Sequence, residues 1–256
     1  MSSSKPSIAE LRPVCQPPAV LGRRSEEHWA GRLYARRVSL HVTRRFLGWG
    51  MSADGVTVLM LLIGLGGAGL LFVGGVWPAV AALVAIQAYL LLDCVDGEVA
   101  RWRRTESARG VYLDRVSHYL VEGLLLVAVG WRAGGDSHPV WLAVGLGGAL
   151  AVVLGRVETD LIDAARAKAG MDAIGDSGSG VRPRPLRWAR RVFDFFPIHR
   201  ITGAVEASVL VAVAAVVDAA RGDLGVSRVL LIVVGSVAAM SAAGHLVLVL
   251  ASDRLR

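Results

Sequence analysis

Long stretches of apolar residues are the feature that most limits how this chain can fold. A helix needs about 20 mainly apolar residues to cross the hydrocarbon core of a bilayer, and residues 56–76 provide 21 in succession without a charge. Further mainly apolar segments follow at 77–92, 111–131, 139–155, 201–220 and 229–251. The predicted fold class is therefore an all-α integral membrane protein with six transmembrane helices.

The composition agrees with this prediction and excludes several other classes of protein. Hydrophobic residues make up 54% of the chain and charged residues 19%, whereas soluble domains carry about 25% charged residues. Two cysteines are too few for a disulfide framework. The net charge of +7 could indicate nucleic-acid binding, so the positions of the charges decide that question.

Lysine and arginine are distributed very unevenly around the predicted spans. Nine lie in the first fifty residues, five in 101–115, nine in 156–200 and two in the C-terminal tail, and only Arg132, Arg221 and Arg228 fall elsewhere. By the positive-inside rule, both termini and the basic loops are predicted to be cytoplasmic, in a protein of the cell (inner) membrane. The positive charge then reflects topology and attraction to anionic membrane lipids, and no nucleic-acid partner is expected.

The first fifty residues are predicted to form a cytoplasmic region that precedes a six-span domain over residues 51–256. Residues 1–18 lack the apolar core of a signal peptide, and residues 2–18 are expected to be a disordered arm. Residues 26–47 alternate apolar and basic side chains, which favours an amphipathic helix on the membrane surface. A solvated charged helix is the alternative. Residues 172–185, rich in Gly, Ser and Pro, read as a flexible loop.

Acidic side chains gather where the second and third predicted spans meet the cytoplasm. Asp93 and Asp96 are three residues apart, and Asp114 and His118 are four apart, so each pair shares one helix face. If the two helices pack as an antiparallel pair, three carboxylates and an imidazole converge. Carboxylates within a bilayer need a partner, and Mg²⁺ prefers carboxylate oxygens while leaving positions for substrate phosphates.

Residues 93–118 resemble the signature of the CDP-alcohol phosphotransferase family, D-x2-D-G-x2-A-R-x8-G-x3-D-x3-D, at every position but the last. Such enzymes transfer a phospho-alcohol group from a CDP-linked donor to an acceptor hydroxyl and release CMP. The resemblance implies a two-metal centre of Mg²⁺ or Mn²⁺. The implied metal ligands are Asp93, Asp96, Asp114 and His118, and the implied nucleotide-binding residues are Thr57, Gly97, Ala100, Arg101 and Gly110. It also implies CDP-diacylglycerol or another CDP-linked donor, a small polar alcohol or lipid acceptor, and a homodimer.

The departure from the family pattern is His118, which stands where the family has an aspartate that serves as metal ligand and general base. In one interpretation His118 is the base, because an imidazole titrates near neutral pH; Asp114 is then the other catalytic residue. Imidazole is also a weaker ligand for Mg²⁺, so Mn²⁺ could be preferred. In the other interpretation the site has lost activity and His118 is a polar core residue.

Basic residues outside the signature suggest where an anionic acceptor could bind. Arg156 and Arg200 lie at predicted cytoplasmic ends of spans, although an arginine that extends to the membrane interface is an equally simple explanation for each. Glu122, Glu206 and His245 lie within spans, where an ionisable group is a functional candidate. Hydrogen bonding between helices is the structural alternative for these three.

Other functions remain open from the sequence. An aspartate-rich membrane prenyltransferase also binds diphosphate, but it should have a second acidic motif, and the acidic group at 158–163 lacks that spacing. A cation-coupled transporter is a further alternative, although the chain has no evident inverted repeat. A catalytically silent family relative acting as a partner subunit is the third. Small-residue runs at 64–69 and 145–148 predict close helix packing or a dimer face.

Overall fold

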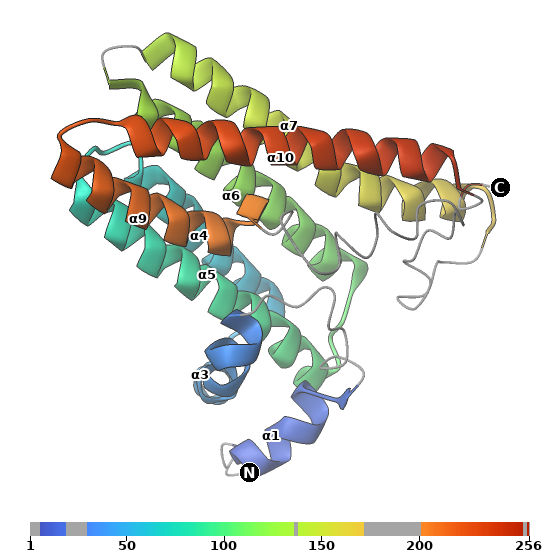
Figure 1. Ribbon diagram of the computed structural model, residues 1–256. Coiled ribbons are helices and arrows are strands. Elements are labelled where there is room, and N and C mark those ends of the chain that lie inside the picture. Colours follow the sequence, from blue (N-terminus) through green and yellow to red (C-terminus); the bar gives the residue numbers. More distant parts are fainter. Residues whose placement is uncertain (1–5, 19–29, 136–137, 172–200, 253–254, 256) are drawn as a thin grey trace. The chain divides into compact units, whose positions relative to one another are not determined.

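The protein is helical throughout the part of the chain that the computed structural model describes, which is residues 6–18, 30–135, 138–171, 201–252 and 255 (Figure 1). The all-α prediction is confirmed for these residues. They form two compact units, Met1–Val121 and Glu122–Arg256. The boundary between the units falls inside one continuous helix, α6 (Ala108–Gly134).

The first unit is built around the long helix α5 (Val76–Arg103). Helix α4 (Ala53–Leu70) packs along it, and the chain reverses between them at Gly75, whose φ of +99° suits glycine. Gly64 and Gly67 of α4 face α5 closely. A Cβ atom on Gly64 would lie 2.7 Å from the Tyr89 ring, and one on Gly67 would lie 2.9 Å from Ala85 Cβ. Within this unit the small-residue run therefore serves helix packing.

The N-terminal segment contains a short helix, α1 (Ile8–Cys15), so the prediction of a disordered arm was wrong there. Ser7 caps the helix and exchanges hydrogen bonds with Glu10, three residues later, in a capping box. The buried side chains of Leu11 and Cys15 pack against Leu40. Local capping and burial against another helix together order a segment that is polar in sequence.

The predicted amphipathic helix corresponds to a π-helical segment, η1 (Gly31–Ala35), followed by helix α3 (Arg36–Gly48). Residues 26–29 of the prediction lie outside the described part of the chain. The buried face of α3 carries Ser39, Leu40 and Thr43 and is packed against α1 and α5. Part of the face that was predicted to enter the membrane surface therefore contacts protein, and a membrane-surface location for this helix stays a prediction.

The second unit contains the C-terminal half of α6 together with α7 (His138–Lys168), α9 (Ala204–Arg221) and α10 (Gly225–Leu250). Helices α7 and α10 run alongside each other (Figure 1). Gly130 of α6 meets Gly145 of α7 backbone to backbone, because a Cβ on Gly130 would lie 2.8 Å from Gly145 Cα. The predicted packing role of the second small-residue run is thus borne out within this unit for Gly145.

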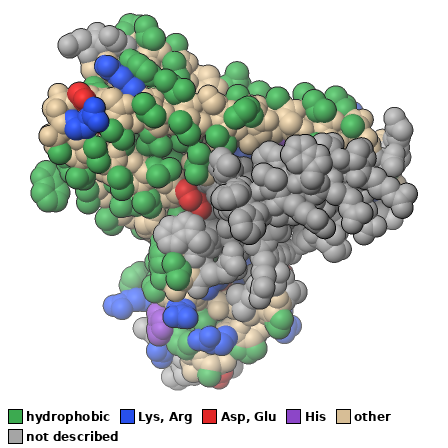
Figure 2. Space-filling model, in the orientation of Figure 1, with side chains coloured by type: hydrophobic (Ala, Val, Ile, Leu, Met, Phe, Trp, Pro, Cys, Tyr) green, Lys and Arg blue, Asp and Glu red, His purple; other side chains and the backbone are tan. Residues whose placement is uncertain are grey.

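Four of the described helices are long and apolar enough to span a membrane: α4, α5, α7 from Pro139, and α10. Large apolar side chains such as Leu62, Leu150 and Val229 are exposed on these helices, and Figure 2 shows hydrophobic side chains over much of the visible helical surface. The predicted third and fifth spans are the helices α6 and α9, which are not among these four. The total of six spans therefore stays a prediction.

Candidate metal centre

Helix α5 places acidic side chains on successive turns near its C-terminal end. Its first 17 residues are uncharged, and the helix continues through Asp93 and Asp96 to Arg103. Arg104 ends it in the left-handed conformation, with φ of 56°. Asp93 lies one turn after Tyr89, so these two side chains share a face of α5.

The partner helix α6 begins immediately after this turn. Ser107 precedes its first residue, and the Ser107 hydroxyl accepts a hydrogen bond of 3.1 Å from the backbone N–H of Gly110. Asp114 and His118 then follow one turn apart on the same face. If α5 and α6 pack as predicted, these two side chains should lie close to Asp93.

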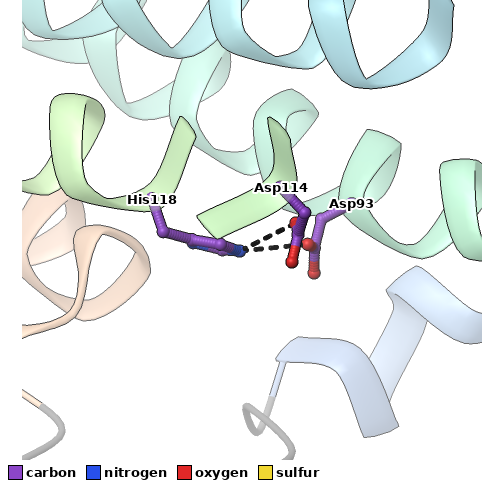
Figure 3. A group of neighbouring side chains, drawn as sticks. All are labelled: Asp93, Asp114 and His118. Carbon is purple, nitrogen blue, oxygen red and sulfur yellow. Dashed lines mark hydrogen bonds and ion pairs between the residues drawn. The ribbon is translucent and has the colours of Figure 1, made fainter. Parts of the chain in front are cut away.

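Asp93, Asp114 and His118 converge on one point (Figure 3). The His118 Nε2 atom lies 3.2 Å from Asp93 Oδ1 and 3.4 Å from Asp114 Oδ1. One ligand atom from each residue lies within 4.8 Å of the others. The two carboxylates are 30% and 35% exposed, which leaves a ligand room to reach them.

This arrangement fits a divalent cation. Asp114 Oδ1 is buried and accepts no hydrogen bond from any described residue; it faces the His118 ring, with Nε2 at 3.4 Å, which is charged only when protonated. A neutral His118 therefore leaves this oxygen without a positive partner. Two carboxylates and an imidazole form a mixed oxygen and nitrogen donor set, which suits Mn²⁺ as well as Mg²⁺. The residues present are therefore compatible with the metal that the signature implies.

Asp96 is the predicted metal ligand that is not a member of this three-residue group. Its Oδ2 atom accepts a hydrogen bond of 2.8 Å from the hydroxyl of Thr57 on α4, and its Oδ1 atom accepts one from the N–H of Gly97. The Asp96 side chain is buried, and so is Thr57. Thr57 therefore holds the Asp96 carboxylate, whereas a direct contact of Thr57 with nucleotide stays a prediction.

Arg101 and Gly97, two predicted nucleotide-binding residues, lie against each other. A Cβ atom on Gly97 would come within 3.0 Å of the Arg101 guanidinium, so the absence of a side chain at Gly97 admits the arginine. Arg101 Nε also donates a hydrogen bond of 2.8 Å to the backbone carbonyl of Cys15 in α1. Ala100 on α5 and Gly110 in the first turn of α6 are both partly buried.

Glu98, which occupies a variable position of the signature, is the most completely buried acidic residue of this unit. It is 0% exposed, and its carboxylate accepts hydrogen bonds from neutral donors on three sides. These donors are Gln16 Nε2 at 2.8 Å, Ser39 Oγ at 2.6 Å and Thr43 Oγ1 at 2.6 Å. Glu98 thereby fastens α1 and α3 to the helix that carries Asp93. No local pattern in the sequence indicates this network, because its partners lie more than fifty residues away.

Tyr89 was also missed, although its position one turn before Asp93 was a usable signal. Its hydroxyl lies 2.7 Å from His118 Nδ1, on the side of the ring opposite to the carboxylates. The two rings meet edge to face, with centroids 5.6 Å apart. Both nitrogens of His118 therefore have a polar neighbour, and the two interpretations of His118 stay predictions.

Two of the three ionisable residues that were predicted within spans, Glu122 and His245, pair with side chains of α7. Arg156 makes a bidentate pair with Glu122, at 2.9 and 2.6 Å, and His245 Nδ1 lies 3.1 Å from Glu158 Oε2. Hydrogen bonding between helices thus accounts for Glu122 and His245. An acceptor-binding role for Arg156 stays a prediction, and Arg200 lies outside the described residues.

Comparison with known proteins adds one finding. The model of the CDP-alcohol phosphatidyltransferase family matches residues 51–171, a range that contains α4, α5 and all three residues of the convergent cluster. No curated protein matches the chain. The matched range ends before α9 and α10 begin.

Proposed function

Because residues 51–171 form a domain of the CDP-alcohol phosphatidyltransferase family, we propose that the protein transfers a phosphatidyl or other phospho-alcohol group from a CDP-linked donor to an acceptor hydroxyl, with release of CMP. CDP-diacylglycerol is the proposed donor, a small polar alcohol the proposed acceptor, and phospholipid biosynthesis the proposed pathway. The observation that carries the proposal is the convergence of Asp93, Asp114 and His118 on one point.

Asp93, Asp114 and His118 are the proposed ligands of a Mg²⁺ or Mn²⁺ ion, and Asp96 is the proposed further ligand of a second ion. Such ions neutralise the charge of a diphosphate and favour in-line attack on phosphorus. An ionised carboxylate has about four lone-pair positions, so Asp96 can accept the hydrogen bond from Thr57 and still bind an ion.

Arg101 is the proposed contact to the donor phosphates. Its planar guanidinium can form two parallel hydrogen bonds with phosphate oxygens, and Gly97 leaves the space beside it. Because Arg101 Nε donates its hydrogen bond to the Cys15 carbonyl, the other guanidinium nitrogens are the proposed donors to phosphate. Ala100 and Gly110 are proposed to line the same nucleotide site, with Thr57 acting through Asp96.

A base must remove the proton of the acceptor hydroxyl, and the proposed candidates are His118 and Asp114. One ring nitrogen cannot bind a metal and accept a proton at the same time. His118→Ala separates these roles: turnover should be lost in either case, whereas Mn²⁺ binding should survive only if His118 is the base. Unchanged turnover in this variant would exclude both roles.

The remaining parts of the proposal concern the surroundings of the site. The positive-inside distribution of lysine and arginine supports a cytoplasmic location for the centre and both termini at the cell membrane. Arg156 and Arg200 are proposed to attract an anionic acceptor, and a homodimer is proposed from the family resemblance alone. Mass measurement of the detergent-solubilised protein by light scattering tests the dimer.

The direct test is CMP release by purified protein in detergent with CDP-diacylglycerol, Mg²⁺ or Mn²⁺, and a pool of glycerol 3-phosphate, serine, inositol and inositol phosphate. We expect CMP only when both metal and acceptor are present, and dividing the pool identifies the acceptor. Asp114→Asn should abolish release. Asp163→Asn is the matched control, because Asp163 is an exposed acidic residue of α7 outside the cluster.

Other outcomes distinguish the alternatives. Nucleotide binding without CMP release would indicate a different donor or acceptor. Absence of both would favour a catalytically silent partner subunit and would point to His118 as the cause. Consumption of a prenyl diphosphate in place of the CDP-linked donor would favour a prenyltransferase, although Glu158, part of the only other acidic group considered for that role, pairs with His245.

A further inference from the structure

The position of the Tyr89 ring is set by close packing. Tyr89 is 2% exposed, and its ring fills the space left by Gly64, since a Cβ atom there would lie 2.7 Å from Tyr89 Cδ2. The same Cβ would lie 2.6 Å from Val121 on α6. A ring enclosed in this way has little freedom to move, so its hydroxyl is a fixed point 2.7 Å from His118 Nδ1.

We infer that Tyr89 is a positioning residue that presents the Nε2 atom of His118 to a divalent cation between Asp93 and Asp114. An imidazole can turn either nitrogen toward a ligand. A nitrogen that is hydrogen-bonded to another group is not available to that ligand, so the other nitrogen binds it. Metal-binding histidines commonly donate the other ring N–H to a neighbouring oxygen, which fixes both tautomer and orientation. Tyr89 Oη is the oxygen that accepts this hydrogen bond from Nδ1 when Nε2 holds the cation.

This role belongs to the histidine and has no counterpart for an aspartate at the same position. A carboxylate offers two equivalent oxygens and needs no tautomer to be selected. Tyr89 should therefore matter when residue 118 is histidine and should matter little after His118→Asp, which restores the signature of the family. The inference rests on the proposed function only in that the cluster binds a divalent cation.

The experiment is a titration of Mn²⁺ against the full-length protein in detergent without substrates, with free Mn²⁺ measured by electron paramagnetic resonance. The four proteins are the wild type, Tyr89→Phe, His118→Asp and the double variant. Loss of an outer partner of a metal-binding histidine weakens binding roughly 10-fold or more, so Tyr89→Phe should raise the Mn²⁺ dissociation constant by about that factor. In the His118→Asp background the same change should alter it by less than about twofold.

Tyr34→Phe is the matched control. Tyr34 also donates a hydroxyl hydrogen bond to α5, at Gln87, but it lies outside the cluster, and Mn²⁺ affinity should be unchanged. An equal loss of affinity for Tyr89→Phe in both backgrounds would mean a general structural role and would overturn the inference. Unchanged affinity in the wild-type background would overturn it while leaving the proposed function intact. Failure of the wild type to bind Mn²⁺ would overturn the metal centre and the inference together.

A second measurement needs no variant of Tyr89 and so does not depend on its folding. Nitrogen NMR of ¹⁵N-histidine-labelled wild-type protein loaded with Mg²⁺ reports which ring nitrogen of His118 carries the proton, with His118→Asp identifying the signal. We expect the proton on Nδ1. A proton on Nε2 in the Mg²⁺-loaded protein would overturn the inference.

Discussion

The two units of the chain place acidic side chains in different surroundings. In the second unit Glu122 is 3% exposed, and its two carboxylate oxygens accept hydrogen bonds from two guanidinium nitrogens of Arg156. In the first unit Asp93 and Asp114 point toward each other and toward His118, and Asp114 Oδ1 has no hydrogen-bond donor among the described residues. A carboxylate that already forms an ion pair with an arginine serves to join the two helices. Two carboxylates that share one imidazole can still take up a cation, so we propose that this difference separates structural from functional acidic residues.

The largest effect should come from removing one carboxylate of the convergent cluster. Asp93→Asn keeps the shape of the side chain but removes a charge that the proposed cation needs, so metal-dependent CMP release should fall by at least about 10³-fold. Thermal stability should change little, because the repulsion between Asp93 and Asp114 and the attraction between Asp93 and His118 are lost together. Loss of activity together with a fall in melting temperature would contradict the contrast between the two units.

Breaking the pair of Arg156 and Glu122 in the second unit should reduce stability more than activity. Arg156→Gln leaves Glu122 buried without its cation, which should destabilise the protein by about 2–3 kcal/mol, at the lower end for buried pairs because Arg156 is half exposed. Adding Glu122→Gln should restore most of the melting temperature. Activity of the restored double variant then tests the acceptor role of Arg156: full activity would exclude that role.

Glu98 offers an intermediate case, because it is fully buried but surrounded by neutral donors. Glu98→Gln replaces one accepting oxygen with an N–H₂ group that must face a hydroxyl or amide donor. The expected loss is about 1–3 kcal/mol, measured by thermal unfolding in detergent. Limited proteolysis should also cut near α1 sooner. Unaltered stability would mean that Glu98 does not hold α1 and α3 in place.

The smallest effect concerns Cys15, whose thiol lies beside this network. Burial, reinforced by the negative charge of Glu98, raises the pKa of Cys15 to about 11. In a Cys94→Ala background, iodoacetamide should therefore modify the folded protein slowly at pH 8 and faster as the pH approaches 11. The unfolded chain ionises first, near the ordinary pKa of 9, so stability from the buried thiol is present below pH 9 and declines between pH 9 and about 11. Rapid modification at pH 8 would contradict the burial.

The sequence was sufficient for the helices and for the centre of the site because both depend on local spacing. The four-residue step from Asp114 to His118 places both on one helix face, and the short turn at 104–107 brings that face back to Asp93. The same helical spacing predicted that Asp96 lies near Asp93, but it did not predict the direction of the Asp96 carboxylate. That direction is set by the Thr57 hydroxyl, 39 residues away in the chain, and a helical period carries no information about such a contact.

The errors at the N-terminus have a related cause. Residues 2–18 are polar and contain prolines, which is typical of a disordered segment, and the capping box of Ser7 and Glu10 was the local signal that was overlooked. The burial of Leu11 and Cys15 depends on α3 and α5, which no local pattern reveals. The number of spans could not be derived from hydropathy for a different reason. Helices α6 and α9 contain charged residues, and hydropathy alone does not distinguish a charged residue in a membrane from one in a protein interior.

The attachment of α1 to α5 also has a consequence for the order in which the chain is made. The contacts from Cys15 to Arg101 and from Gln16 to Glu98 join residues 86 and 82 positions apart. An eight-residue helix is unstable on its own in water, so α1 leaves the ribosome long before the surface that stabilises it exists. We expect its docking to be a late step in biosynthesis, after α5 has been inserted. A bulky fusion at the N-terminus should therefore delay completion of the site more than the same fusion at the C-terminus.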